Sequence, residues 1–88
     1  MKTAPSLITP GGQMSDKEKL MLTMLVYGFN CRKIAESLGI STHYVYYLSR
    51  LLKARFAADT HAAVVSKAIA EGIISAEGQL LPQQTKND

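Results

Sequence analysis

The chain has 88 residues, which is room for one small domain. Ten Lys and Arg against seven Asp and Glu give a net charge of +3, which favours an anionic partner without proving one. No apolar run is long enough to span a bilayer, and no secretory signal pattern is visible. A single cysteine cannot form an internal disulfide, so we expect a protein of the reducing cytoplasm.

Proline and glycine divide the chain into a central domain and two tails. Residues 1–13 contain Pro5, Pro10 and a glycine pair, which interrupt regular structure, and residues 75–88 contain Gly78 and Pro82 before a polar end. We therefore predict an N-terminal tail over 1–13, a domain over 14–74 and a C-terminal tail over 75–88. The domain shows no sustained alternation of apolar and polar residues, so we expect it to be all-α with four helices.

The first predicted helix spans about residues 16–28. Ser15 and Glu18 form the Ser-x-x-Glu pattern of a capping box, and Gly28 is placed to end the helix. Four apolar residues at helical spacing are expected to face the core: Met21, Leu22, Leu25 and Val26. A second apolar stripe lies beside them, formed by Leu20, Met24 and Tyr27. We interpret this stripe as a possible surface for a protein partner. The alternative is that Leu7 and Ile8 of the N-terminal tail cover it.

The next two predicted helices are separated by a very short turn. Asn30 caps a helix over about 31–38, Gly39 ends it, and Ser41 caps a helix over about 42–56. Four apolar residues recur along one face of the longer helix and are expected to be buried: Val45, Leu48, Leu52 and Phe56. We also expect Tyr44 to pack inside. Two helices joined by a tight glycine turn are typical of helix-turn-helix domains, which place the second helix in the DNA major groove.

The last predicted helix covers about residues 60–72, with Asp59 or Thr60 as its cap and Gly72 at its end. Its apolar residues fall into two groups. One contains Val64 and Ala68, and the other, about 100° around the helix, contains Val65 and Ile69 with Ala62. One group must cover the core, and the other is left partly open.

The ordered pattern from Met14 to Ile74 resembles the LuxR/FixJ/GerE family of helix-turn-helix domains. The stretch Ile34-Ala35, Leu38, Ile40-Ser41 and Val45 is similar to the family's EIA..L.IS..TV core. Further matching positions are Glu18, Gly28, Leu52, Phe56, Val65, Ala68 and Gly72-Ile73-Ile74. The resemblance is to standalone, GerE-like members of this bacterial type. It implies a four-helix domain without a wing that binds double-stranded DNA as a homodimer and regulates transcription.

The resemblance and the helical phase together select the residues expected to contact DNA. These are Arg32, Lys33, Thr42, His43, Tyr46, Tyr47, Arg50 and Lys53. Arg50 has the donors to read guanine, and Tyr46 and Tyr47 can contact thymine methyl groups. The others are expected to contact phosphates. Arg55 adds to the positive charge of this region. Dimerisation through the last helix, which the resemblance implies, is assigned to Ala62, Val65 and Ile69.

Two departures from the family pattern leave an alternative function open. Tyr46 stands where the family often has lysine, and Leu48 stands where it often has histidine. Leu48 lies on the inward side, so we expect it to be buried. The alternative is a protein-interaction module, such as an anti-activator, that kept the fold and binds another regulator instead of DNA.

Catalytic patterns are missing from the sequence. It contains no glycine-rich phosphate loop and no mutually supporting set of catalytic side chains, so we expect neither enzymatic activity nor a cofactor. His43 and His61 lack a third ligand at useful spacing, and we expect no metal site.

Overall fold

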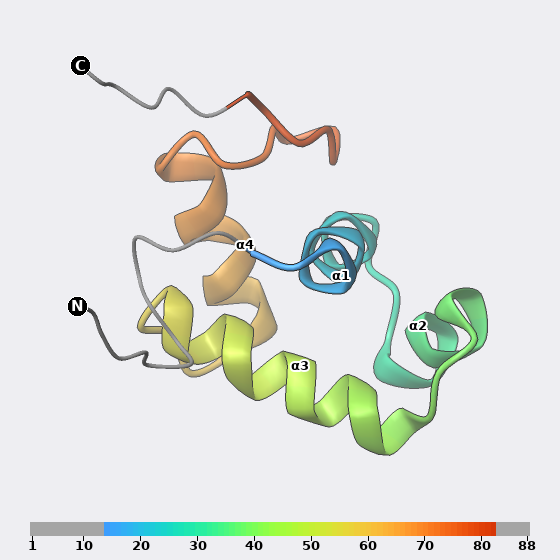
Figure 1. Ribbon diagram of the computed structural model, residues 1–88. Coiled ribbons are helices and arrows are strands. Elements are labelled where there is room, and N and C mark those ends of the chain that lie inside the picture. Colours follow the sequence, from blue (N-terminus) through green and yellow to red (C-terminus); the bar gives the residue numbers. More distant parts are fainter. Residues whose placement is uncertain (1–13, 83–88) are drawn as a thin grey trace, which may run out of the picture.

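The computed structural model describes residues 14–82 and confirms an all-α domain of four helices. The helices are α1 (Asp16–Val26), α2 (Cys31–Leu38), α3 (Thr42–Arg55) and α4 (His61–Ala70). In Figure 1, α3 is the long helix along the lower edge, with α2 at its beginning and α4 at its end, and α1 is seen nearly end-on between them. Within residues 14–82 no strand is formed, and the only β-pairing is one isolated bridge.

Each helix is preceded by a capping residue, whose side chain accepts a hydrogen bond from an otherwise unpaired backbone N–H of the first turn. The four capping residues are Ser15, Asn30, Ser41 and Thr60. Thr60 rather than Asp59 is therefore the cap of α4. Ser15 and Glu18 form the predicted capping box, in which each side chain bonds the other residue's backbone N–H.

The helix ends differ slightly from the predicted ones. Helix α1 ends at Val26 rather than at residue 28, and α4 ends at Ala70 rather than at residue 72. The physical reason is the glycine itself: Gly28 and Gly72 have φ of 87° and 74°, a left-handed conformation that lies outside the helix it terminates.

All four helices contribute to one hydrophobic core. Its buried residues are Met21, Leu22, Leu25, Ile34, Ala35, Val45, Leu48, Leu52, Phe56, Val64, Ala68 and Ile74. The predicted inward face of α3 is confirmed in full, and Leu48 is only 1% exposed. On α4, Val64 and Ala68 cover the core, so the side bearing Val65 and Ile69 is the one left outside.

An ion pair connects the beginning of α1 to the end of α3. Arg55 Nη2 donates to Glu18 Oε2 at 3.5 Å, and both side chains are less than a tenth exposed. The other carboxylate oxygen of Glu18 accepts the Ser15 N–H of the capping box. Arg55 was expected to add to the positive surface of the helix-turn-helix, but its guanidinium group is instead held inside the domain.

Residues beyond α4 turn back across the domain. Ile74 pairs with Leu80 in the isolated antiparallel bridge, and the Leu81 N–H donates to the Ile73 carbonyl. Gly78 lies against the ring of Tyr27 at the end of α1, so closely that a Cβ there would be 3.0 Å from the ring. The described part of the predicted C-terminal tail, up to residue 82, is therefore anchored at these contacts. Among residues 14–82, none of the helices combines the length and the apolar character needed to cross a membrane.

Candidate nucleic-acid interface

Three residues make the turn between α2 and α3. Gly39 adopts a left-handed φ of 70°, and the Ile40 N–H donates to the Ala35 carbonyl, which closes the end of α2. Ser41 then caps α3 by accepting the Tyr44 N–H at 3.0 Å. Because the turn is this short, α2 is held directly against α3 and the direction of α3 is fixed relative to the core.

The side of α3 that faces away from the core is exposed. We call Thr42, His43, Tyr46, Tyr47, Arg50 and Lys53 the α3 outer face. All six lie at the surface as predicted, with Lys53 half-buried and the others exposed. At about 100° per residue, His43, Tyr47 and Arg50 form the central ridge, and Thr42, Tyr46 and Lys53 flank it.

Tyrosines dominate the first half of this face. Tyr46 is 54% exposed, the highest of the three tyrosines of α3. Tyr44 and Tyr47 stack with ring centroids 5.7 Å apart and ring planes 14° apart. The expectation that Tyr44 packs inside is wrong, because its ring leans on Tyr47 at the surface and does not enter the core.

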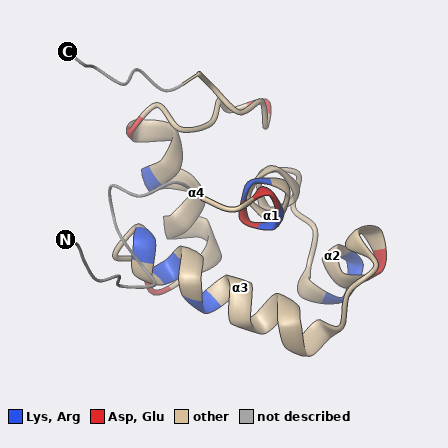
Figure 2. Ribbon diagram, in the orientation of Figure 1, with Lys and Arg blue, Asp and Glu red and all other residues tan. Residues whose placement is uncertain are grey.

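Positive charge is also present at the surface of α2. Arg32 and Lys33, in the first turn of α2, are both exposed. Figure 2 shows Lys and Arg at the beginning of α2 and in the second half of α3, the half nearer α4, and α3 contains neither Asp nor Glu. The structure places these two cations on the helix that packs against α3. Glu36, also exposed, is the one acidic residue of α2.

His61 connects α3 to the first turn of α4. Its Nε2 lies 2.6 Å from Oγ of Ser49, a buried residue of α3. Burial lowers the pKa of His61, and the nearby positive charge of Lys53 lowers it further. Its imidazole is therefore kept neutral at the joint between the two helices. No group of three or more potential metal ligands comes together within residues 14–82.

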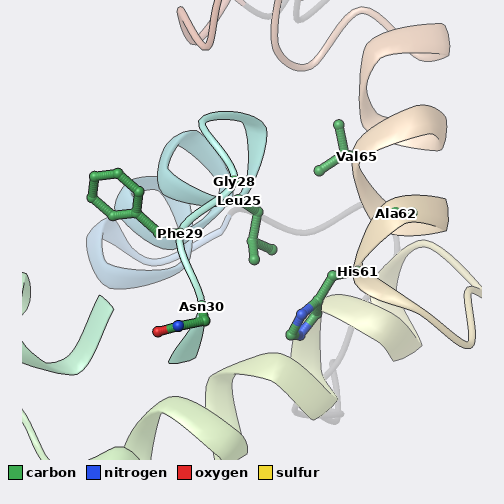
Figure 3. A pocket seen from close by; sticks show the side chains of 7 residues that line it. All are labelled: Leu25, Gly28, Phe29, Asn30, His61, Ala62 and Val65. Carbon is green, nitrogen blue, oxygen red and sulfur yellow. The ribbon is translucent and has the colours of Figure 1, made fainter. Parts of the chain in front are cut away.

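The exposed side of α4 borders a shallow groove. We call Ala62, Val65 and Ile69 the α4 outer face; Ala62 and Ile69 are exposed and Val65 is half-buried. The groove, of about 490 Å³, is lined by Leu25, Gly28, Phe29, Asn30, His61, Ala62 and Val65. Figure 3 shows Leu25, His61 and Val65 facing the space between the end of α1 and α4. The groove was not predicted, because it depends on how the α1–α2 connection sits beside α4.

The apolar stripe predicted on α1 is only partly exposed. Leu20 is 47% and Tyr27 61% exposed, whereas Met24 is half-buried and packs against the core. Tyr27 also contacts Gly78 and lies 6.4 Å, centroid to centroid, from Phe29. The alternative covering by Leu7 and Ile8 lies outside the described residues.

In comparisons with protein-family models, curated proteins and solved structures, nothing matches this chain. What the structure shows is an all-α domain of four helices, in which a three-residue turn joins α2 to α3. The resemblance to the LuxR/FixJ/GerE family rests on the residues quoted from the sequence.

Proposed function

We propose that the protein is a transcriptional regulator of the LuxR/FixJ/GerE type that binds double-stranded DNA as a homodimer. The observation that carries the proposal is the α3 outer face: it is exposed, it contains Arg50 and Lys53 but no carboxylate, and Arg32 and Lys33 stand on the adjoining helix. A surface with this charge suits a polyanion, and the helix that bears it directly follows a tight turn. The single cysteine fits an activity in the reducing cytoplasm.

In this proposal α3 is the recognition helix. Its first turns enter the major groove, and Arg50 donates two hydrogen bonds to O6 and N7 of a guanine. Five other predicted residues contact phosphates: Arg32, Lys33, Thr42, His43 and Lys53. These contacts orient the domain on the duplex without reading its sequence.

Dimerisation is assigned to the α4 outer face. The small side chain of Ala62 allows two helices to approach closely, and twofold symmetry makes each residue count twice in the interface. A single short helix buries little area, so we expect the free protein to be monomeric at micromolar concentration and to pair on DNA.

Duplex binding measured at several salt concentrations tests the proposal. With fluorescently labelled genomic fragments, we expect saturable binding whose affinity falls steeply with salt. Each phosphate contact contributes a slope of about 0.9 in log Kd against log salt. Lys53→Ala should lower that slope by about 0.9, the contribution of one phosphate contact. Lys17→Ala removes the same charge from an exposed site on α1 and should leave the slope unchanged. An absence of saturable binding at low salt contradicts the proposal.

The alternative function is a protein-interaction module that binds another regulator. The exposed tyrosines of α3 favour it, because tyrosine is enriched at protein interfaces. The stripe of Leu20, Met24 and Tyr27 offers a second surface for such a partner, although Met24 is half-buried. This function predicts a heterodimer with a larger helix-turn-helix regulator in light scattering, together with no duplex binding at any salt concentration.

A further inference from the structure

The first two turns of α3 are unusual for a surface that reads bases. The outward residues there are Thr42, His43, Tyr44, Tyr46 and Tyr47. None has an amide or guanidinium group, the groups that make two hydrogen bonds to one base edge. The first such group on the α3 outer face is Arg50, about a turn beyond Tyr46 and Tyr47. The part of the helix that enters the groove first therefore presents mainly aromatic rings.

The stacked pair limits the freedom of this surface. Tyr44 holds the Tyr47 ring in a nearly parallel stack, which restricts its rotamers before any ligand binds. A side chain that is already ordered loses less entropy on binding. Tyr47 is thus a prearranged apolar contact on the central ridge, and Tyr46 is a second ring on its flank with more than half its surface open.

Thymine is the base whose major-groove edge suits such rings. It presents a C5-methyl group, which gains from apolar contact, and an O4 acceptor, which a tyrosine hydroxyl can satisfy. Cytosine presents an amino donor in the same groove and has no methyl group. An aromatic ring placed over that amino group would leave a polar atom desolvated without a partner.

We infer that Tyr46 and Tyr47 select thymine-rich half-sites by packing their rings on thymine C5-methyl groups, beside the one guanine contacted by Arg50. The inference rests on the proposed DNA binding and adds to it the class of sequence that is bound. The selectivity comes from methyl burial and not from a hydrogen-bond code.

Duplexes that differ only in the C5-methyl group test the inference. One duplex alternates A and T, and its partner replaces every thymine by uracil. Each buried methyl contributes about a fourfold change in Kd, so loss of two contacts should weaken binding about sixteenfold. Neither duplex contains guanine, so the contribution of Arg50 is the same in both. Restoring the methyl as 5-methylcytosine in an alternating G and C duplex should strengthen binding relative to unmodified cytosine.

Variants assign the effect to the two rings. Tyr46→Ala and Tyr47→Ala should each reduce the difference between the thymine and uracil duplexes, and the double variant should abolish it. Tyr46→Phe and Tyr47→Phe keep the ring and remove only the hydroxyl, so they should retain it. Both positions changed are exposed, and thermal melting verifies that the variants remain folded.

The outcomes separate this inference from the function on which it rests. Equal affinity for the thymine and uracil duplexes, with salt-dependent binding to both, overturns the inference and leaves DNA binding in place. A difference that persists in the double alanine variant also overturns it, because the methyl groups are then read elsewhere. Failure to bind any of the four duplexes overturns both proposals.

Discussion

The outer faces of α3 and α4 are both exposed and both partly apolar, but they are built from different side chains. The α3 outer face combines tyrosine rings with cations, whereas the α4 outer face has only Ala62, Val65 and Ile69. The tyrosine hydroxyl remains hydrated at the surface, so an exposed tyrosine ring is tolerated in the unbound protein. Small aliphatic side chains have no such hydroxyl and gain only from another apolar surface. In the proposed function this difference suits two separate tasks, one toward a polyanion and one toward a second protein surface.

The largest expected effect concerns the core that supports both faces. Leu48→Ala removes a fully buried side chain from the inner side of α3 and should lower the free energy of unfolding by about 2–5 kcal/mol. Tyr46→Ala, two residues earlier and on the outer side, should change it by less than about 0.5 kcal/mol. Urea denaturation followed by circular dichroism measures both. Similar losses in the two variants would mean that the inner and outer sides of α3 are assigned incorrectly.

The next effect distinguishes the two faces by their ligand. Arg50→Ala should weaken specific duplex binding by about 1–3 kcal/mol and relax base preference at one position of each half-site. Selection from random duplexes, with wild type and variant compared at one salt concentration, measures both quantities. Unchanged affinity and preference would remove Arg50 from the reading surface.

A charge on the other face should act on pairing alone. Val65→Glu and Ile69→Glu should abolish cooperative binding to a site with two half-sites, a loss of at least about tenfold or 1.4 kcal/mol, while binding to one half-site is retained. Ala70→Glu adds the same charge at an exposed position about 100° around α4 and is the control. Circular dichroism should show at least one of the first two variants folded. Should both fold and still bind cooperatively, the dimer forms elsewhere, with Leu20 and Tyr27 of α1 as the next surface to test.

A smaller effect concerns the turn that joins α3 to α4. Ala57 has φ of 51°, a left-handed conformation that costs a residue with a Cβ about 1–2 kcal/mol. Its carbonyl accepts a hydrogen bond from Lys67 Nζ at 2.7 Å, which ties the end of α3 to α4. Ala57→Gly should stabilise the domain by about 0.5–1 kcal/mol, because relief of strain exceeds the added freedom of the unfolded chain.

Ala54→Gly is the matched control for this turn. It makes the same substitution in the last turn of α3, where glycine should destabilise the domain by up to about 1 kcal/mol. Thermal melting of both variants should therefore give shifts of opposite sign, and shifts of the same sign would contradict the assigned strain at Ala57.

The smallest effect is a pH dependence of the stability, caused by His61 where α4 meets α3. Because the folded state lowers the pKa of His61, the unfolded chain binds a proton more readily near the usual value of 6.5. The stabilisation is therefore present above that pH and declines as the pH falls through 6.5 toward the lower pKa of the folded state. Comparing wild type with His61→Gln by denaturation at each pH isolates this contribution. A wild-type stability that rises relative to the variant on acidification would contradict it.

The sequence was sufficient for the features that depend on neighbouring residues. Capping residues, terminating glycines and the inner face of α3 follow rules that act over one or two helical turns, and Ser15, Gly39 and Leu48 all behave as those rules predict. The prediction for Tyr44 failed because the residue lies at the border between the two sides of α3. At such a border the neighbouring side chains determine which way the ring turns. Tyr47, three residues further along α3, provides a ring on which Tyr44 stacks.

Features that join distant segments could not be predicted. The contact of Gly78 with Tyr27, the groove beside α4 and the bond between Ser49 and His61 depend on packing that no local pattern specifies. The same limit applies to function. The residues of the α3 outer face could be selected from the sequence, but which ligand they bind stays a proposal.

The ion pair between Glu18 and Arg55 has a consequence for how the chain folds and how it can change. Its partners are 37 residues apart, so the carboxylate that caps α1 gains its second partner only after α3 has docked. The contact therefore couples the stability of the beginning of α1 to the docking of α3, and such coupling favours all-or-none folding. Removing Arg55 alone would leave the buried carboxylate of Glu18 without this cationic partner. Positions 18 and 55 are therefore expected to vary together, as a polar pair or as an apolar pair, in any related sequence.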